Sequence, residues 1–379
     1  MRVAFNAHLL SYRHWYRSAG ISRYIDRTMT HLAPYLRDDG CQAFVGPDAP
    51  AESSALNWLP LVRTPLPTHR PLARIIWEQV IAPVALRQTR AELLHCPAYV
   101  TPFGCPCPSV VTFHDLSFFV TPEAFNRTNR LYLQTFSRLT ARRATRFIAV
   151  SEATRQDMVR LLGITPERIV VAHNAADGEF APIGDPNRLA EFRRAQGVPE
   201  RFILYLGTLE PRKNVPALIR AYALARQRGV SEPLILAGGR GWGESSLAAL
   251  VQELGLTNSV RHVGFVGMTD RVLWYNAATL FAYPSRYEGF GMPPLEAMAC
   301  GTAVVSSNRS SLPEAVGDAG WLVDPDDPAS LAEALVRLLS DDELRCDYAA
   351  RGLARAGGFS WDASAQVTIA AFQSALGRA

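Results

Sequence analysis

The strongest constraint on the fold is an alternation of short apolar runs with helical stretches, which occurs twice along the chain. Runs of Val, Ile, Leu and Phe between helical segments are typical of parallel strands covered by helices on both faces. The pattern therefore predicts an α/β protein with two doubly wound parallel sheets in series. The expected strands are 2–8, 42–47, 93–97, 109–115, 146–151 and 168–174 in the first half, and 202–208, 233–239, 260–266, 280–284, 302–307 and 320–324 in the second.

The length of 379 residues also indicates two domains. Residues 178–200 are polar and contain prolines, so we predict the linker there. The predicted domains are 1–180 and 181–358, followed by a terminal helix at 359–379. The stretch 48–76 is rich in Pro, Ala and Arg, and its weak periodicity predicts a loop with a short helix.

Composition excludes several classes of protein. No apolar run approaches the roughly 20 residues that span a bilayer, and the N-terminus lacks the charged and apolar regions of a signal peptide. The six cysteines are scattered, and the close pair Cys105 and Cys107 has neither zinc-binding nor thioredoxin-like spacing. We therefore expect a cytoplasmic protein with reduced thiols.

Charge is distributed unevenly along the chain. Residues 1–185 contain 20 Lys and Arg against 15 Asp and Glu, whereas the remainder contains 19 against 20. The basic N-terminal half favours an anionic acceptor or peripheral association with the inner face of a membrane. A solvated basic face is the alternative, and no nucleic-acid partner is expected. Of the 39 basic residues only Lys213 is a lysine, and it follows Arg212 at a predicted strand end.

Residues 280–301 form the most informative local pattern. An apolar strand is followed by a loop with Gly289 and Gly291, and Pro293-Pro294 then suits the first turn of a helix, where no amide donor is needed. Amides at a helix N-terminus attract anions. This segment is therefore expected to bind a phosphate or sugar oxygens.

Two carboxylates flank this loop. Glu288 stands at the strand end, where open α/β sheets bind ligands, and Glu296 lies about one turn into the helix. A carboxylate accepts two hydroxyls at once, so a ribose diol is a natural partner for either side chain. The alternatives are that Glu288 is a solvated loop charge and that Glu296 only favours the helix dipole.

Other strand ends carry groups suited to the same kind of ligand. Gly20, in the loop before the first helix, lets the backbone approach a phosphate. His114 ends the fourth strand, and Asp115 is expected to fix the imidazole tautomer or to cap the next turn. Arg212 and Lys213 together suit a diphosphate. A turn glycine and a buried structural histidine are the alternatives for Gly20 and His114.

Two stretches carry a family resemblance. The run from Glu288 to Glu296 resembles the E-x7-E motif of the retaining family-4 glycosyltransferases, and residues 208–214 resemble their strand-end Arg-Lys pair. The resemblance covers almost the whole chain. It implies the GT-B fold, in which two Rossmann-like doubly wound domains face a central cleft and the terminal helix returns to the first domain. The chain departs from the family at Ala19-Gly20, where Gly-Gly is common, and at Asn174-Ala175, where Asn-Gly is usual.

The same resemblance implies a role for each candidate residue. Catalysis is expected of His114 and Glu288. The donor diphosphate is expected to contact Gly20, Arg212, Lys213, Gly291 and Met292; the sugar His114, Glu288, Phe290 and Gly291; and the nucleoside Gly239, Val266 and Glu296. The glycine-rich loop 238–243 is expected to line the nucleotide pocket. Apart from the resemblance, the Trp, Tyr and Arg residues that precede Gly20, within 12–17, suggest an acceptor-binding flap.

The resemblance also implies a reaction. It is the retaining transfer of a hexose to a glycan or lipid-linked glycan, with mannose from GDP-mannose as the best guess and UDP-sugars left open. The chain has no Asp-x-Asp motif of the kind that metal-dependent sugar transferases use, so we expect neither a metal nor a further cofactor. We expect the acceptor hydroxyl to attack on the face that the leaving phosphate occupies, and a covalent glycosyl-Glu288 is the competing mechanism. A nucleotide-sugar epimerase and a non-catalytic nucleotide-sugar-binding protein are the alternative functions.

Overall fold

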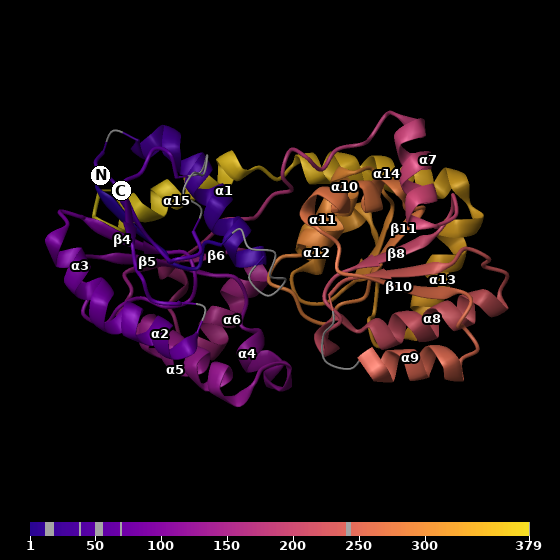
Figure 1. Cartoon of the computed structure of the whole chain (residues 1–379), viewed down its shortest axis with the longest axis horizontal. Helices are drawn as coiled ribbons and strands as arrows, with labels where there is room; N and C mark the ends of the chain where they lie inside the picture. Colours follow the sequence, from indigo (N-terminus) through magenta and orange to yellow (C-terminus); the bar gives the residue numbers. More distant parts are fainter. Residues whose placement is uncertain (12–18, 38, 50–55, 69, 240–243, 379) are drawn as a thin grey trace. The chain divides into compact units, whose positions relative to one another are not determined.

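The computed structural model of the chain describes residues 1–11, 19–37, 39–49, 56–68, 70–239 and 244–378. The expected acceptor flap at 12–17 and residues 240–243 of the glycine-rich loop lie outside these ranges. The chain forms two compact units, of which the first comprises Met1–Asn174 and Ser360–Ala379 and the second Ala175–Phe359. Both contain a parallel sheet with helices on each face, which confirms the predicted α/β, doubly wound class (Figure 1).

The sheet of the first unit has seven strands in the order β3-β2-β1-β4-β5-β6-β7, all paired in parallel. Its strands are β1 Val3–Ala7, β2 Gln42–Val45, β3 Leu61–Arg63, β4 Leu93–Cys96, β5 Ser109–Phe113, β6 Arg146–Ala149 and β7 Ile169–Val171. The strand order changes direction between β1 and β4. Ligands of open α/β sheets bind outside the carboxyl ends of the strands at such a point.

Helices cover both faces of this sheet, and each face has its own apolar core. On one face α1 (Ala19–Leu36) lies beside α15 (Trp361–Ala375), and the buried side chains include Phe5, Leu32 and Phe372 (Figure 1). The opposite face is covered by α2 Pro71–Ile76, the π-helix η1 Trp77–Ile81, α3 Ala82–Gln88, α4 Ser117–Val120, α5 Arg127–Arg143 and α6 Glu152–Leu162, with 3-10 turns at η2 Pro122–Ala124 and η3 Pro166–Arg168.

The sheet of the second unit has six parallel strands in the order β10-β9-β8-β11-β12-β13. Its strands are β8 Ile203–Leu206, β9 Leu234–Ala237, β10 Val260–Gly264, β11 Leu280–Tyr283, β12 Val304–Ser307 and β13 Trp321–Val323. Here the direction changes between β8 and β11. Residues that follow these two strands therefore meet at one edge, although Arg212 and Glu288 are 76 positions apart in the chain.

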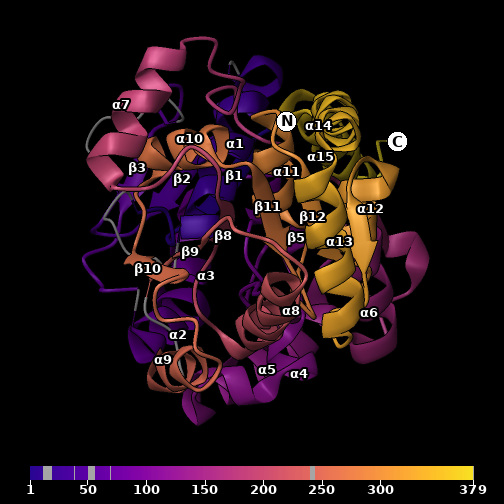
Figure 2. The same cartoon turned by 90° about the vertical axis from the view of Figure 1, so that its right-hand side faces the viewer.

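Helices also cover both faces of the second sheet. One face carries α7 Pro186–Gln196, α10 Met268–Ala277, α11 Met292–Ala299 and α14 Asp342–Gly357. The other carries α8 Val215–Gln227, α9 Glu244–Glu253 and α13 Pro328–Ser340, with α8 and α13 packed together (Figure 2). Short elements complete the unit at η4 Pro211–Lys213, α12 Leu312–Val316 and η5 Gly317–Ala319.

Three local predictions were wrong. The stretch 48–76 contains the edge strand β3 as well as a helix, and α1 begins at Ala19, so Gly20 lies inside the first turn rather than before it. Residues 178–200 are not an open linker, because they contain α7, which Asp185 caps by accepting hydrogen bonds from the amides of Asn187 and Arg188. None of the described helices is both long and apolar enough to cross a membrane.

Candidate functional site

The predicted diphosphate-binding pair lies immediately after β8. A single 3-10 turn, η4, carries both Arg212 and Lys213, and Asn214 ends it in the left-handed conformation, with φ of 57°. The side-chain amide of Asn214 donates a hydrogen bond to the carbonyl of Pro325 at 2.6 Å, which fixes the turn to the loop after β13. This anchoring holds the Lys213 side chain in a buried position.

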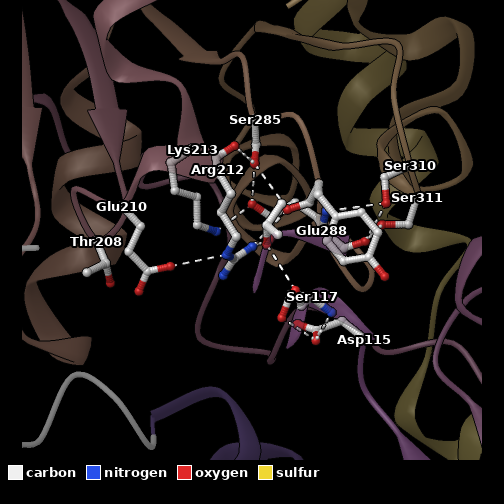
Figure 3. A network of polar contacts seen from close by, with 12 residues as sticks. Asp115, Ser117, Thr208, Glu210, Arg212, Lys213, Ser285, Glu288, Ser310 and Ser311 are labelled. Atoms are coloured by element: carbon white, nitrogen blue, oxygen red, sulfur yellow. Dashed lines mark hydrogen bonds and ion pairs between the residues drawn. The ribbon is translucent and has the colours of Figure 1, made fainter. Parts of the chain in front are cut away.

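Glu288, which follows β11, is the centre of a polar network (Figure 3). Its Oε1 accepts hydrogen bonds from Lys213 Nζ at 2.5 Å, from the Ser285 hydroxyl at 2.7 Å and from the Tyr283 hydroxyl at 3.0 Å. Its Oε2 accepts from Arg212 Nη1 at 2.9 Å. Because Glu288 is only 8% exposed and has four side-chain donors, it is not a solvated loop charge.

The charged groups of this network shift one another's pKa values. Burial alone raises the pKa of Glu288, but the cations of Arg212 and Lys213 outweigh it and hold that pKa at about 2. Burial and the neighbouring Arg212 lower the pKa of Lys213, and Glu288 opposes that shift. The carboxylate and the ammonium therefore depend on each other for their charged states.

Two serines hold the backbone of Glu288. The hydroxyls of Ser310 and Ser311 donate hydrogen bonds to its carbonyl oxygen at 2.7 and 2.9 Å. Ser311 occupies the N-cap position of α12, but its side chain makes no capping hydrogen bond. Both hydroxyls therefore position the Glu288 backbone rather than capping the helix.

The loop after Glu288 leads into α11 as the sequence predicts. Gly291 stands at the N-cap with φ of 115°, a backbone conformation that favours glycine, and a β-carbon there would crowd Leu312 Cδ2 at 3.0 Å. Met292 is the first residue of α11. The ring of Phe290 is buried against the ring of Phe359, with centroids 5.4 Å apart, so its side chain serves packing.

The three predicted nucleoside-binding residues lie on separate elements. Glu296 is buried in α11, and its Oε2 accepts a hydrogen bond from the Tyr275 hydroxyl at 3.0 Å. The carbonyl of Gly239, just after β9, accepts the Leu209 amide at 3.3 Å, and Val266 is buried after β10. Their contacts with a nucleoside stay predictions.

The other predicted residues belong to the first unit. His114 follows β5, and its Nε2–H donates to the carbonyl of Pro97 at 2.7 Å, while the rings of Tyr24 and Tyr99 pack against the imidazole. Burial lowers the pKa of His114, against the opposing effects of the Pro97 bond and Asp115. Asp115 accepts from the amide and hydroxyl of Ser117, so it caps the next turn and does not set the tautomer.

Gly20 has open space around it, because a β-carbon there would meet no heavy atom within 4 Å. The structure therefore gives no packing reason for a glycine at this position, and its role at a phosphate stays a prediction.

Sequence reasoning missed several side chains that hold the candidate site. Tyr283 and Ser285 donate to Glu288, and Tyr99, with φ of 56°, packs on His114. The position of Tyr283 and Ser285 around the end of a predicted strand was a usable indication. Nothing in the sequence indicated the conformation of Tyr99, since positive φ is uncommon outside glycine, asparagine and aspartate.

The described residues contain no group of three or more His, Cys, Asp or Glu side chains placed to hold a metal ion. The expectation that the chain lacks an Asp-x-Asp motif needs a correction, because Asp324 and Asp326 have that spacing. Their carboxylates, however, pair with Arg309 at 2.8 Å and with Arg286 at 2.7 Å.

Comparison with known proteins places this site in a family. Residues 25–180 match the model for Glycosyltransferase Family 4, and residues 189–355 match the model for glycosyl transferases group 1. The O-antigen chain mannosyltransferase B of Escherichia coli is 37% identical over 290 residues, which is 76% of each chain. The chain belongs to the family-4 glycosyltransferases. It is a glycosyltransferase, and the resemblance read from the sequence is confirmed.

Further relatives of this family-4 glycosyltransferase are more distant. The serotype-specific mannosyltransferase WbdA of Escherichia coli is 34% identical over 237 residues, which is 61% of this chain but only 29% of that longer protein. Among solved structures, Anabaena Alr3699/HepE in complex with UDP and glucose superposes with a TM-score of 0.73 at 24% identity, over 99% of this chain and 100% of the other. Sucrose-phosphate synthase from Thermosynechococcus elongatus gives 0.76 at 19% identity over the full length of both. These structures establish the GT-B fold.

Proposed function

We propose that this glycosyltransferase moves mannose from GDP-mannose to a glycan or lipid-linked glycan, with retention of anomeric configuration and without a metal ion. Two kinds of relative support the choice of mannose, because both the O-antigen chain mannosyltransferase B and WbdA are named for that transfer. The use of GDP as the nucleotide and the nature of the acceptor belong to the proposal.

The observation that carries the proposal is the buried Lys213–Glu288–Arg212 network at the ends of β8 and β11. An ammonium has three protons to donate. Among the described residues, those of Lys213 contact the Tyr283 hydroxyl and Glu288 Oε1, which leaves a third for a phosphate oxygen. Together with the amides at the start of α11, this cation stabilises the negative charge that develops on the leaving diphosphate.

The same network argues against a glycosyl-enzyme. Both carboxylate oxygens of Glu288 accept hydrogen bonds, and the pKa of about 2 makes it a weak base and a weak nucleophile. In the proposed reaction Glu288 instead orients the sugar and stabilises developing positive charge. The acceptor hydroxyl attacks the anomeric carbon on the face that the diphosphate leaves, and its proton passes to the departing phosphate oxygen.

His114 contributes an uncharged hydrogen-bonding group in this proposal. Because Nε2–H donates to Pro97, the neutral imidazole presents Nδ1 as an acceptor. A sugar hydroxyl is a suitable donor to that nitrogen, and a lowered pKa keeps the ring neutral near pH 7.

The first test is donor binding. Thermal unfolding is measured with GDP, GDP-mannose, UDP and UDP-glucose, because a ligand present at 100 times its Kd raises stability by about 2.7 kcal/mol. We expect GDP and GDP-mannose to raise the Tm more than the uridine compounds. The Lys213→Gln variant is expected to lose that shift, whereas Arg220→Gln, an exposed position on α8, is expected to keep it.

The second test is the product. With GDP-mannose and a mannose-containing acceptor, nuclear magnetic resonance is expected to show retained configuration at the anomeric carbon, and the rate is expected to be unchanged by EDTA. An inverted product, a loss of rate in EDTA, or a glycosyl adduct on Glu288 found by mass spectrometry would each overturn part of the proposal. A new nucleotide sugar formed without acceptor would identify an epimerase.

A further inference from the structure

Two thiols lie side by side in the segment 97–108, which joins β4 to β5. Cys105 and Cys107 are separated only by Pro106, and their sulfur atoms are 3.8 Å apart. Both side chains are half-buried, and Pro106 between them is exposed, so a small molecule in solvent can reach the sulfur atoms. We call Cys105 and Cys107 the thiol pair. The proposed sugar reaction assigns no role to either residue.

Backbone contacts hold the thiol pair in this arrangement. The amide of Cys105 donates a hydrogen bond to the carbonyl of Pro102 at 3.2 Å, which closes a turn just before the pair. The carbonyl of Pro108, just after the pair, accepts the amide of Leu94 at 2.9 Å and so fixes that end to β4. Proline at 106 and 108 further restricts the backbone, because its ring fixes φ. The sulfur atoms are therefore kept close together before any bond joins them.

The hydrogen bond between the two thiols makes them chemically unequal. It lowers the pKa of Cys105 and, together with burial, raises the pKa of Cys107. The thiolate is the reactive form of cysteine, so Cys105 is the nucleophile and Cys107 supplies the second thiol. Burial raises the pKa of Cys96, at the end of β4, well above its ordinary value, so that thiol stays protonated.

We propose that the thiol pair is a reversible redox site, which a peroxide converts into a disulfide. The Cys105 sulfur attacks one oxygen of hydrogen peroxide, so that an S–O bond forms as the O–O bond breaks, and the hydroxide released takes up a proton to become water. The Cys107 sulfur then attacks the Cys105 sulfur. An S–S bond forms, the S–O bond breaks, and the hydroxide leaves as water with the proton of Cys107.

The balance of this sequence is complete. Both sulfur atoms are oxidised, and one hydrogen peroxide is reduced to two molecules of water. A dithiol such as dithiothreitol restores the two thiols by exchange and is itself oxidised to a disulfide. The inference is independent of the proposed function, since it concerns thiol chemistry and not the sugar reaction.

Formation of the disulfide is expected to strain the segment 97–108. An S–S bond is about 2.05 Å long, so the two sulfur atoms must approach each other from 3.8 Å. Because the chain just after Cys107 is fixed to β4, we expect Cys105 and the turn before it to move. That turn includes Phe103, whose amide donates to Gln79 Oε1 at 3.1 Å.

The same segment contacts His114 through its first residues. The carbonyl of Pro97 accepts the imidazole Nε2–H at 2.7 Å, and the ring of Tyr99 packs against the imidazole with centroids 5.7 Å apart. We therefore expect the redox state of the thiol pair to alter the environment of this histidine.

Mass spectrometry of the full chain tests the disulfide. After treatment with hydrogen peroxide and then iodoacetamide, we expect the peptide that contains the thiol pair to be lighter by two hydrogen atoms and to carry no alkyl group at either position. Dithiothreitol is expected to make both positions open to alkylation again. Alkylation of both thiols after peroxide treatment, or their irreversible conversion to sulfonic acids, would overturn the proposal.

Two single variants separate the pair from ordinary thiol reactivity. Cys107→Ser is expected to stop at the sulfenic acid of Cys105, which dimedone traps as an adduct. Cys346→Ser removes the exposed cysteine of α14 and is expected to form the disulfide like the unaltered protein. A disulfide in Cys107→Ser would overturn the proposal, because Cys105 would then pair with another cysteine. So would oxidation of Cys346 at the same rate as Cys105.

Two local measurements test the expected strain without an assay of sugar transfer. In the oxidised protein the Phe103 amide is expected to exchange with solvent faster, and the Nε2–H resonance of His114 is expected to shift in the nuclear magnetic resonance spectrum. Peroxide is expected to change neither signal in Cys107→Ser. A disulfide that leaves both signals unchanged would overturn the link between the thiol pair and His114.

Discussion

Lys213 is the residue on which the candidate site depends most directly. It is buried, its pKa is lowered by burial and by Arg212, and its carboxylate partner Glu288 has a pKa of about 2. Sequence reasoning selected Arg212, Lys213 and Glu288 as ligand-binding groups, but it did not show that they bind one another. That contact depends on β8 and β11 being neighbours in the sheet, an order set by packing rather than by local sequence.

A double-mutant cycle tests this pairing. Lys213→Met and Glu288→Leu are each expected to lower the free energy of unfolding by about 3 kcal/mol, because each leaves a buried charge without its partner. The double variant is expected to lose less than either single variant, since both charges are then removed. Urea denaturation, with hydrogen exchange to locate the effect in the second unit, measures all four proteins.

A surface pair provides the control for this cycle. Arg228 and Glu333 lie 2.5 Å apart but are both 46% exposed, so the same cycle there is expected to give a coupling below about 1 kcal/mol. Acid provides a second readout. The lowered pKa means that Glu288 stabilises the fold above its ordinary value of 4.5 and loses this effect, about 3 kcal/mol, as pH falls through 2. Equal couplings at the two sites would contradict the prediction.

Among the helices and strands, the sequence predicted those whose pattern of apolar residues agrees with their burial. The central strands are buried on both faces and are largely apolar, which is why β4, β5, β8 and β11 were found, although β4 contains His95 and β5 contains Ser109 and Thr112. β3 was missed because it is three residues long and its Val62 and Arg63 are exposed. α7 was missed because Phe192 is its one buried residue, although Asp185-Pro186 and Gly197 mark its two ends.

The close approach of the chain at the ends of β8 and β9 leads to a specific prediction. A β-carbon on Gly238 would lie 1.9 Å from the carbonyl oxygen of Gly207, where the chain leaves β8 and β9 side by side. Gly238→Ala is therefore expected to destabilise the second unit by at least about 3 kcal/mol, because backbone atoms must move. It is also expected to weaken nucleotide binding, since Gly239 follows directly. Urea denaturation and nucleotide titration measure the two effects.

Gly357 provides the matched control for this substitution. It ends α14, is exposed, and would place a β-carbon in open space, with no heavy atom within 4 Å. Gly357→Ala is expected to leave stability unchanged or to raise it by up to about 1 kcal/mol, because alanine favours helix. An unaltered Cm for Gly238→Ala would show that β8 and β9 separate more easily than their packing indicates.

At the scale of the whole molecule, elements that are far apart in the sequence pack in the same unit. α15 is last in sequence but belongs to the first unit. Trp361 packs on the Tyr24 ring, with centroids 6.1 Å apart, and Arg146 donates to the hydroxyl of Ser374 at 3.0 Å. Periodicity predicts a terminal helix but not the core that it enters, because the Arg146 bond joins residues 228 positions apart.

The buried Phe372 on α15 tests this return to the first unit. Its ring packs against His95 and Phe5, with centroids 5.1 and 6.5 Å away, and it is fully buried. Phe372→Ala is expected to cost about 3–5 kcal/mol through the cavity that it leaves. Hydrogen exchange should then show faster opening of β1 and α1 while β8 and β11 keep their protection. Gln373→Ala, at the exposed neighbouring position, is expected to change neither unit. Equal loss of protection in both units would mean that α15 supports the whole chain and not the first core alone.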